Sequence, residues 1–455
     1  MEFNENSGVT MPDKTEIQGN GVGIVSLTSL LCKSAEEFPN QKAITVSGKY
    51  QLTHSQLQAT VNACAARLKA VGVGHGDVVA LAFPNSIEFV VLFMAVIRAR
   101  GVAAPLNAAY TAEEFEFYLA DSKSKLLLLP AEGNTAAETA VTKIGLPVAK
   151  CQFSLLSDGG GSFEFVSESP GFDLDLGLSK DEAEDSCDIH DDMALFLHTS
   201  GTTSRPKGVP LTQLNLAAST LHIKDTYELS SSDTTVITLP LFHVHGLVAG
   251  LLSSLISGAS VVLPATGRFS ASTFWTDMLT HGATWYTAVP TIHQILLDRH
   301  ASKPEDQYPE LRFIRSCSAS LAPIVLERLE SAFGAPVLEA YAMTEASHQM
   351  TSNPLPHRGR RKPSSVGKAT GIELAILNES GVVQSQGCTG EVCIRGVNVT
   401  NGYQNNPEAN ETAFQFGWFH TGDLGYLDDE SYLFLKGRIK ELINRGGRFP
   451  RLSLI

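Results

Sequence analysis

Apolar residues follow two different spacings along most of the chain. Over residues 57–68 they recur at the intervals of a helix, over residues 77–83 they form a short continuous run, and residues 87–99 return to helical spacing. A short apolar run bounded by turn residues is typical of a strand that is buried on both faces. Helices and strands that alternate in this way predict an α/β fold of stacked, mostly parallel sheets, in which ligands bind at the carboxyl ends of strands.

The same alternation continues through the middle of the chain. Residues 111–119 predict a helix, residues 126–129 and 311–316 predict strands, and residues 246–263 begin with helical spacing and end in a β-branched strand. The apolar run 89–97 has about half the length of a membrane-spanning helix, and the run 246–263 is diluted by glycine and serine. We therefore expect both to be core elements and no segment to span a membrane.

From about Ser365 the pattern changes to short pieces that are rich in strand formers and separated by glycines. Residues 373–377, 391–395 and 432–435 are of this kind. They predict a small barrel or antiparallel sheet, and we expect a β-barrel subdomain over about residues 365–437.

The negative charge of the chain is concentrated in one segment. The net charge is −14, and residues 158–192 hold twelve acidic side chains against the single base Lys180. Proteins that bind nucleic acid present basic surfaces to its phosphates, and the rest of this chain is close to balance. We expect no nucleic-acid partner and interpret the acidic segment as a solvated loop.

Cysteine usage and the N-terminus both indicate a reducing compartment. The seven cysteines are spread along the chain without a C-x-x-C pair, as is typical of free thiols. Residues 1–23 are polar and lack the basic start and apolar run of a secretory signal. We expect this segment to be disordered and the protein to be cytoplasmic.

The first chemical motif is a hydroxyl-rich loop that follows the apolar residues 195–197 and ends in Pro206-Lys207-Gly208. Small residues let backbone N–H groups approach an anion, hydroxyls add donors, and Lys207 supplies positive charge, so the loop is suited to a nucleotide's phosphates. It is not a Walker loop, because proline precedes the lysine and glycine follows it. The alternative is a polar surface loop. The candidate phosphate contacts are Thr199, Ser200, Gly201, Thr202 and Thr203.

The loop resembles the T-S-G-T-T-G-x-P-K-G motif of the adenylate-forming superfamily, which includes acyl-CoA synthetases, luciferases and peptide-synthetase adenylation domains. It departs at Ser204, where the family usually has glycine. Four further segments resemble family motifs in the family's order, and the resemblance extends over nearly the whole chain. They are residues 316–323, 339–345, 421–423 and 437–441.

The resemblance implies a role for particular residues in these segments. The ring of Tyr341 stacks on adenine, Thr344 contacts the α-phosphate, and Glu345 binds Mg²⁺, the cation that offsets the charge of pyrophosphate. Asp423 accepts hydrogen bonds from the ribose hydroxyls, with Arg438 as a second ribose contact. The other nucleotide-site positions are Ser318, Ala319, Ser320, Glu339 and Ala340.

The implied reaction is the ATP-dependent joining of an acid to coenzyme A. A carboxylate attacks the α-phosphate of ATP, Mg²⁺ and Lys207 stabilise the departing pyrophosphate, and the acyl-adenylate is then attacked by the thiol. The partners are therefore a small carboxylic acid, ATP and coenzyme A. The implied AMP-binding adenylation domain spans residues 24–437, followed by a hinge over residues 438–447 that contains Lys440.

The acid itself is indicated by a narrower resemblance, to the plant and fungal oxalate–CoA ligases. His243, Ser318 and His348 would offer donors to a second carboxylate. His243 is equally suited to gating the pocket, and both roles stay open. The segments that carry the resemblance are residues 241–247, 315–320 and 344–348.

The C-terminal end departs from the family pattern. After Gly447 the family continues into a mobile catalytic domain, whereas this sequence has residues 448–455, which also differ from the S-K-L type of peroxisomal signal that full-length relatives can carry. The resemblance implies that the mobile domain is missing and that catalysis is impaired. Two alternatives remain, a 4-coumarate–CoA ligase-like enzyme and a non-catalytic nucleotide-binding isoform, and the sequence leaves the oligomeric state open.

Overall fold

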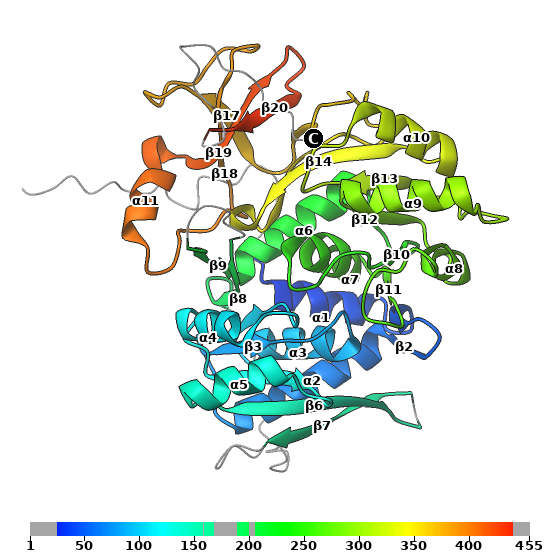
Figure 1. Ribbon diagram of the computed structural model, residues 1–455, viewed down its shortest axis with the longest axis vertical. Helices are drawn as coiled ribbons and strands as arrows, with labels where there is room; N and C mark the ends of the chain where they lie inside the picture. Colours follow the sequence, from blue (N-terminus) through cyan, green and yellow to red (C-terminus); the bar gives the residue numbers. More distant parts are fainter. Residues whose placement is uncertain (1–24, 158, 168–188, 200–204, 440–455) are drawn as a thin grey trace, which may run out of the picture.

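The computed structural model describes residues 25–157, 159–167, 189–199 and 205–439, and these residues form three sheets with helices around them (Figure 1). The first sheet is parallel in its centre and has one antiparallel pair at each edge. Its seven strands, in spatial order, are β7 (Gly161–Ser167), β6 (Val148–Leu155), β5 (Leu126–Pro130), β3 (Val78–Leu81), β4 (Val102–Pro105), β8 (Met193–His198) and β9 (Gly208–Thr212).

The second sheet repeats this arrangement on a larger scale. Six of its nine strands pair in parallel, with antiparallel pairs at both edges. Its strands, in spatial order, are β16 (Lys368–Ala369), β15 (His348–Ser352), β14 (Val337–Met343), β13 (Phe313–Ser316), β12 (Trp285–Ala288), β10 (Thr234–Val236), β11 (Ser260–Leu263), β1 (Lys42–Val46) and β2 (Tyr50–Thr53). The prediction of an α/β fold with mostly parallel sheets is confirmed.

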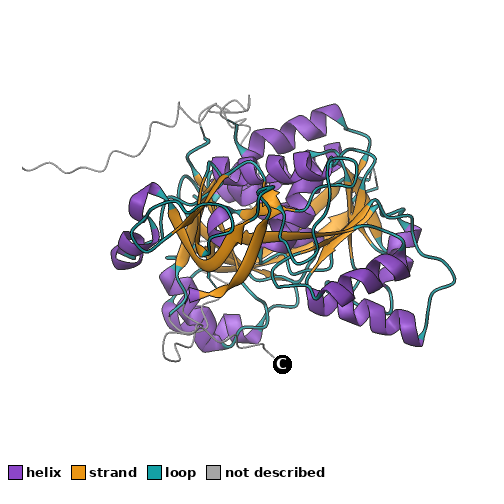
Figure 2. Cartoon of the chain, turned by 90° about the horizontal axis from the view of Figure 1, so that it is seen from above, coloured by secondary structure: helices purple, strands orange, loops and turns teal. Residues whose placement is uncertain are grey.

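One group of helices lies between the two large sheets, and two further groups cover their other faces (Figures 1 and 2). The central group is α1 (Leu27–Glu37), α2 (His54–Ala70), α3 (Ile87–Arg98), α6 (Gln213–Tyr227), the π-helix η1 (His245–Leu252) and α7 (Ser253–Ile256). The outer helices are α4 (Ala112–Asp121) and α5 (Thr135–Ile144) on the first sheet, and α8 (Phe274–Thr280), α9 (Pro290–Ser302) and α10 (Pro323–Phe333) on the second.

Helix α3 shows why the apolar run 89–97 is a core element. Residues 87–97 are almost all buried because this helix packs against α2, β3 and β4 within the first sheet's core. Helices of the described residues are all too short or too polar to cross a lipid bilayer.

The third sheet corrects one expectation. Its strands are all antiparallel, as predicted for residues 365–437, and they lie at one end of the molecule beside β9 and β14 (Figure 1). Within the described residues its four strands pair in the open order β17-β18-β19-β20, so the sheet is not the expected closed barrel. Its elements are β17 (Glu373–Leu377), β18 (Gly390–Arg395), α11 (Pro407–Ala413), η3 (Gln415–Gly417), β19 (Phe419–Leu427) and β20 (Leu433–Arg438).

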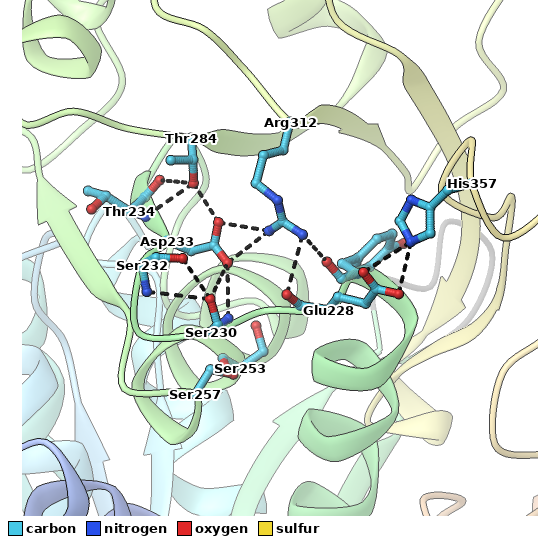
Figure 3. Close-up of polar contacts among 11 residues, drawn as sticks. Glu228, Ser230, Ser232, Asp233, Thr234, Ser253, Ser257, Thr284, Arg312 and His357 are labelled. Carbon is cyan, nitrogen blue, oxygen red and sulfur yellow. Dashed lines mark hydrogen bonds and ion pairs between the residues drawn. The ribbon is translucent and has the colours of Figure 1, made fainter.

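An ion pair between the half-buried Arg312 and the buried carboxylate of Asp233 ties the end of α6 to the second sheet (Figure 3). The Asp233 carboxylate, of which 1% is exposed, accepts hydrogen bonds from Arg312 Nη1 at 2.7 and 2.8 Å. It also accepts from Thr284 Oγ1 at 2.7 Å and from the Ser230 backbone N–H at 2.9 Å. Because Arg312 Nη2 donates to the Tyr227 carbonyl at 2.9 Å, the cluster sets the position of β13 relative to α6.

Replacing Asp233 with alanine should lower the free energy of unfolding by about 3 kcal/mol, because the change leaves the partners of a buried charge unpaired. Urea unfolding would measure the effect. The control is Glu373→Ala, which breaks an ion pair with Arg395 in which both side chains are exposed and should cost less than about 1 kcal/mol. Equal losses from the two variants would contradict the structural role given to Asp233.

Candidate active site

Three of the predicted nucleotide segments begin where a strand of a large sheet ends. The hydroxyl-rich loop follows β8, the small-residue turn follows β13, and the short helix η2 (Thr344–Ala346) follows β14. Carboxyl ends of parallel strands are the usual ligand sites of α/β sheets. The fold therefore places the candidate residues where a ligand is expected.

Both ends of the hydroxyl-rich loop are held together by the β8–β9 hairpin. The Thr199 N–H donates to the Lys207 carbonyl at 2.9 Å, and the Lys207 N–H donates to Thr199 Oγ1 at 3.2 Å. The other predicted phosphate contacts lie outside the described residues. They are Ser200, Gly201, Thr202 and Thr203.

Tyr403 links the predicted phosphate lysine to the predicted magnesium ligand. Lys207 Nζ lies 3.9 Å from the centre of the Tyr403 ring, within range of a cation–π interaction. The Tyr403 hydroxyl donates to Glu345 Oε1 at 2.7 Å, and burial together with the Glu345 charge raises the pKa of Tyr403. The neutral Tyr403 hydroxyl thus holds one oxygen of the Glu345 carboxylate. A carboxylate is an oxygen ligand of the kind that hard cations such as Mg²⁺ prefer.

A short bridge, defined as residues 398–404, fixes this arrangement through backbone contacts. The Gln404 N–H donates to the Gly208 carbonyl at 2.9 Å, next to Lys207, and the Thr400 N–H donates to the Glu345 carbonyl at 2.7 Å. Thr400 Oγ1 also donates to the Pro210 carbonyl at 2.7 Å. The bridge therefore joins β9 to η2. Sequence reasoning missed Tyr403, because a tyrosine after glycine in a polar stretch carries no chemical signal of its own.

The residues predicted to hold adenosine meet in one place. The Tyr341 hydroxyl donates a short hydrogen bond to Asp423 Oδ2, and Arg438 Nε lies 3.1 Å from Asp423 Oδ1. Burial, and then the Asp423 charge, raises the pKa of Tyr341 well above its usual value. Strand β14 thus meets β19 and β20 of the third sheet through these side chains. Lys440, the predicted hinge residue, lies outside the described residues.

Glu339 has a separate environment on the same strand. Its Oε2 accepts from the Ser364 N–H at 3.2 Å, and burial raises its pKa to about 7. The side chain lines a cavity of about 320 Å³ together with basic residues of the 360–362 segment. Ala340 is buried next to it, and Thr344 opens η2 with its side chain half-buried.

The candidate acyl pocket combines an exposed turn with buried imidazoles. Ser318, Ala319 and Ser320 are exposed, and Ser318 has a left-handed backbone with φ of 71°. Ser318 Oγ lies 2.9 Å from Nδ1 of the buried His245, whose ring stacks on that of His348 with centroids 4.9 Å apart.

Two of the predicted substrate residues differ in exposure. His348 is 1% exposed and has φ of 101°, a strained conformation of the kind that gathers at functional sites. His243 is exposed, and its Nδ1 accepts from the His245 N–H at 3.2 Å. This position is compatible with gating and with direct contact. His245 and Arg315 lie within the segments 241–247 and 315–320, but sequence reasoning assigned neither a role in the site. Arg315, which contacts both buried imidazoles, could have been found as a charged residue inside a predicted buried strand.

The comparisons with known proteins agree with this geometry. The family model described as AMP-binding enzyme matches residues 31–404. The chain is 63% identical over 423 residues to an oxalate–CoA ligase from Arabidopsis thaliana, covering 93% of this chain and 80% of that protein. It is equally identical over 423 residues to a probable CoA ligase, CCL9, from Humulus lupulus, with 93% and 79% covered. The crystal structure of ATP-bound MatB from Rhodopseudomonas palustris is similar at a TM-score of 0.79 and 30% identity, covering 93% of this chain and 81% of that one.

Proposed function

This chain belongs to the family of AMP-binding enzymes that ligate acids to coenzyme A, and from that premise we propose that it activates oxalate as an acyl-adenylate and passes the oxalyl group to the thiol. The identity of 63% to an oxalate–CoA ligase supports this acid. The structural observation that carries the choice is the polar cluster of Ser318, His245 and His348, since hydroxyl and imidazole donors suit a second carboxylate.

The first step is an attack of one oxalate oxygen on the α-phosphorus of ATP. A new P–O bond forms, the bond between the α-phosphorus and the bridging oxygen breaks, and pyrophosphate leaves. Lys207, with the donors of residues 199–203, would stabilise the charge on pyrophosphate, and Thr344 would contact the α-phosphate. Glu345 would hold Mg²⁺, which supplies further positive charge when bound.

The adenosine half would be held by the Tyr341 and Asp423 pair. Asp423 would exchange its hydrogen bond from the Tyr341 hydroxyl for bonds from the ribose, and Arg438 would add a second contact. The small residues 318–320 and the strand segment 339–340 would line the adenine site. In the second step the coenzyme A thiol loses its proton and attacks the acyl carbon, and AMP leaves. We assign these roles to an adenylation domain over residues 24–437, with the hinge at Lys440.

Acid-dependent exchange of pyrophosphate into ATP tests the proposal directly. Oxalate should support exchange and 4-coumarate should support little, because the pocket offers hydrogen-bond donors and not an apolar wall for a ring. Exchange with 4-coumarate alone would favour the coumarate alternative. ATP binding without exchange for any acid would favour a non-catalytic nucleotide-binding protein, and either result would overturn the proposal.

His348→Ala should raise the KM for oxalate about tenfold and leave the KM for ATP close to that of the unchanged protein. The loss of a donor to a charged group costs about 1.4 kcal/mol or more. Steady-state exchange at varied oxalate and ATP gives both constants. The control is His54→Ala, since His54 is another buried imidazole but lies on α2; it should leave both constants unchanged. Equal shifts in the two constants for His348→Ala would argue against its place in the pocket.

A further inference from the structure

Arg315 is a buried cation that has no Asp or Glu among its hydrogen-bond partners in the described part of the chain. The side chain is fully buried on β13. It donates to Tyr227 Oη at 2.8 Å, His245 Nε2 at 3.1 Å, Thr287 Oγ1 at 3.1 Å, His348 Nε2 at 3.0 Å and Gln349 Oε1 at 3.2 Å, and it also contacts the Cys317 thiol. A buried charge without an opposite partner is costly, so its retention next to a ligand pocket calls for an explanation in terms of function.

The guanidinium determines which nitrogen of each imidazole carries the proton. Arginine has N–H donors and no acceptor, so the Nε2 atoms of His245 and His348 must both accept. Each neutral ring therefore carries its hydrogen on Nδ1. With Nε2 of His245 as an acceptor, the Thr287 hydroxyl, which lies 2.6 Å from this nitrogen, must be its donor.

The tautomers leave hydrogen-bond donors at the candidate acyl-binding residues Ser318 and His348. The Nδ1–H group of His245 donates to Ser318 Oγ at 2.9 Å, so the Ser318 hydroxyl hydrogen remains for another acceptor. His348 presents its own Nδ1–H, which makes no hydrogen bond to the described part of the chain. The two routes from Arg315 thus end in hydrogen-bond donors, the hydroxyl of the exposed Ser318 and the Nδ1–H of the buried His348.

Both imidazoles keep this state over the physiological pH range. Burial, and then the charge of Arg315, lowers the pKa of His245 and of His348 well below the ordinary value. The direction of the shift means that each ring is neutral at any pH above its lowered pKa. The donor arrangement is then preserved between about pH 6 and 8.

We propose that Arg315 is a positioning residue that makes the pocket selective for an acid bearing a second carboxylate, by fixing His245, Ser318 and His348 as donors and by supplying the positive charge that a dianion neutralises. The proposal rests on the ligase function proposed above and adds the reason for its selectivity. Arg315 acts through its neighbours, because its guanidinium contacts Nε2 of each imidazole and the opposite nitrogen, Nδ1, is the proposed donor.

The test compares oxalate with oxamate, which keeps the reacting carboxylate and replaces the second one with a neutral amide of nearly the same shape. Exchange kinetics of the unchanged protein should favour oxalate strongly. Arg315→Gln should reduce the ratio of the two kcat/KM values by tenfold or more, mainly through the KM for oxalate, at an unchanged KM for ATP. Arg315→Lys, which restores the charge, should recover part of the ratio.

Arg312→Gln is the matched control. It removes an arginine three residues away whose partners are Asp233 and the carbonyls of Tyr227 and Glu228. This variant should be less stable and keep the preference for oxalate. An unchanged ratio in Arg315→Gln, or an equal loss in Arg312→Gln, would overturn the proposal. If the unchanged protein does not use oxalate at all, the failure belongs to the proposed function.

A second measurement needs no variant at position 315. Long-range ¹H–¹⁵N spectra of histidine-labelled protein distinguish the two neutral tautomers, and the signals of His245 and His348 can be assigned by their loss in single substitutions. Both rings should be Nδ1–H tautomers with no titration between about pH 6 and 8. An Nε2–H tautomer or an imidazolium at either position would also overturn the proposal, even if Arg315→Gln fails to fold.

Discussion

Lys207→Ala is expected to slow oxalate-dependent pyrophosphate exchange by about 10²- to 10³-fold, the usual effect of removing a preorganised group that stabilises developing charge. Lys207 stands at the end of the hydroxyl-rich loop, and its ammonium group is already positioned on the face of Tyr403, 3.9 Å from the ring centre. Charge that accumulates on the leaving pyrophosphate would be met by a cation that needs little reorganisation. The loss should fall on kcat and on the KM for ATP, with little change in the KM for oxalate.

Lys436→Ala provides the control for this prediction. Lys436 also lies over a tyrosine ring, 4.7 Å from the centre of Tyr426, but at an exposed position of β20. Its removal should leave exchange unchanged. A similar loss in both variants, or normal exchange in Lys207→Ala, would show that the position of Lys207 does not matter for the reaction.

Glu345→Gln is expected to reduce exchange by about 10²-fold at ordinary magnesium concentrations, and higher magnesium should recover part of the loss. The amide keeps the size of the side chain and still accepts from the Tyr403 hydroxyl, so the change removes mainly the negative charge that attracts a hard cation. A magnesium titration of the exchange rate gives the midpoint for each protein.

The midpoint in Glu345→Gln should move to higher magnesium. Glu330→Gln is the control variant, because Glu330 is also a partly buried carboxylate. It pairs with Arg361 and accepts from the Val337 N–H at the start of β14, whereas η2 follows the end of that strand. Its titration should match that of the unchanged protein. An unshifted midpoint in Glu345→Gln would rule out the proposed role of this carboxylate in holding the cation.

The sequence predicted those parts of the fold and site that depend on neighbours along the chain. Three such elements were predicted: strand β13, helix α3, and the apolar strand β8 that leads into the hydroxyl-rich loop. Local spacing and turn residues determine elements of this kind. The prediction of a β-barrel over about residues 365–437 was wrong. Whether a sheet closes into a barrel depends on how distant strands tilt and pair, which the sequence of each strand does not determine.

Contacts between side chains that are distant in sequence were beyond local reasoning. The hydrogen bond from Tyr341 to Asp423 joins residues of two different sheets, and the two positions were predicted only as separate nucleotide contacts. Arg315 belongs to the segment 315–320 that resembles the oxalate–CoA ligases. Its effect on the imidazoles, however, depends on contacts with β12, β15 and η1, which are distant in sequence. Physical packing, and not the spacing of residues, decides such contacts.

The position of Tyr403 affects the arrangement of charged groups in the site before its substrates bind. Lys207 and Glu345 carry opposite charges, and a direct ion pair between them would have to be broken each time nucleotide and cation arrive. The aromatic face holds the ammonium group and the hydroxyl holds the carboxylate, so a neutral side chain stands between the two. Tyr403 therefore contacts both charged groups of the site through one uncharged side chain.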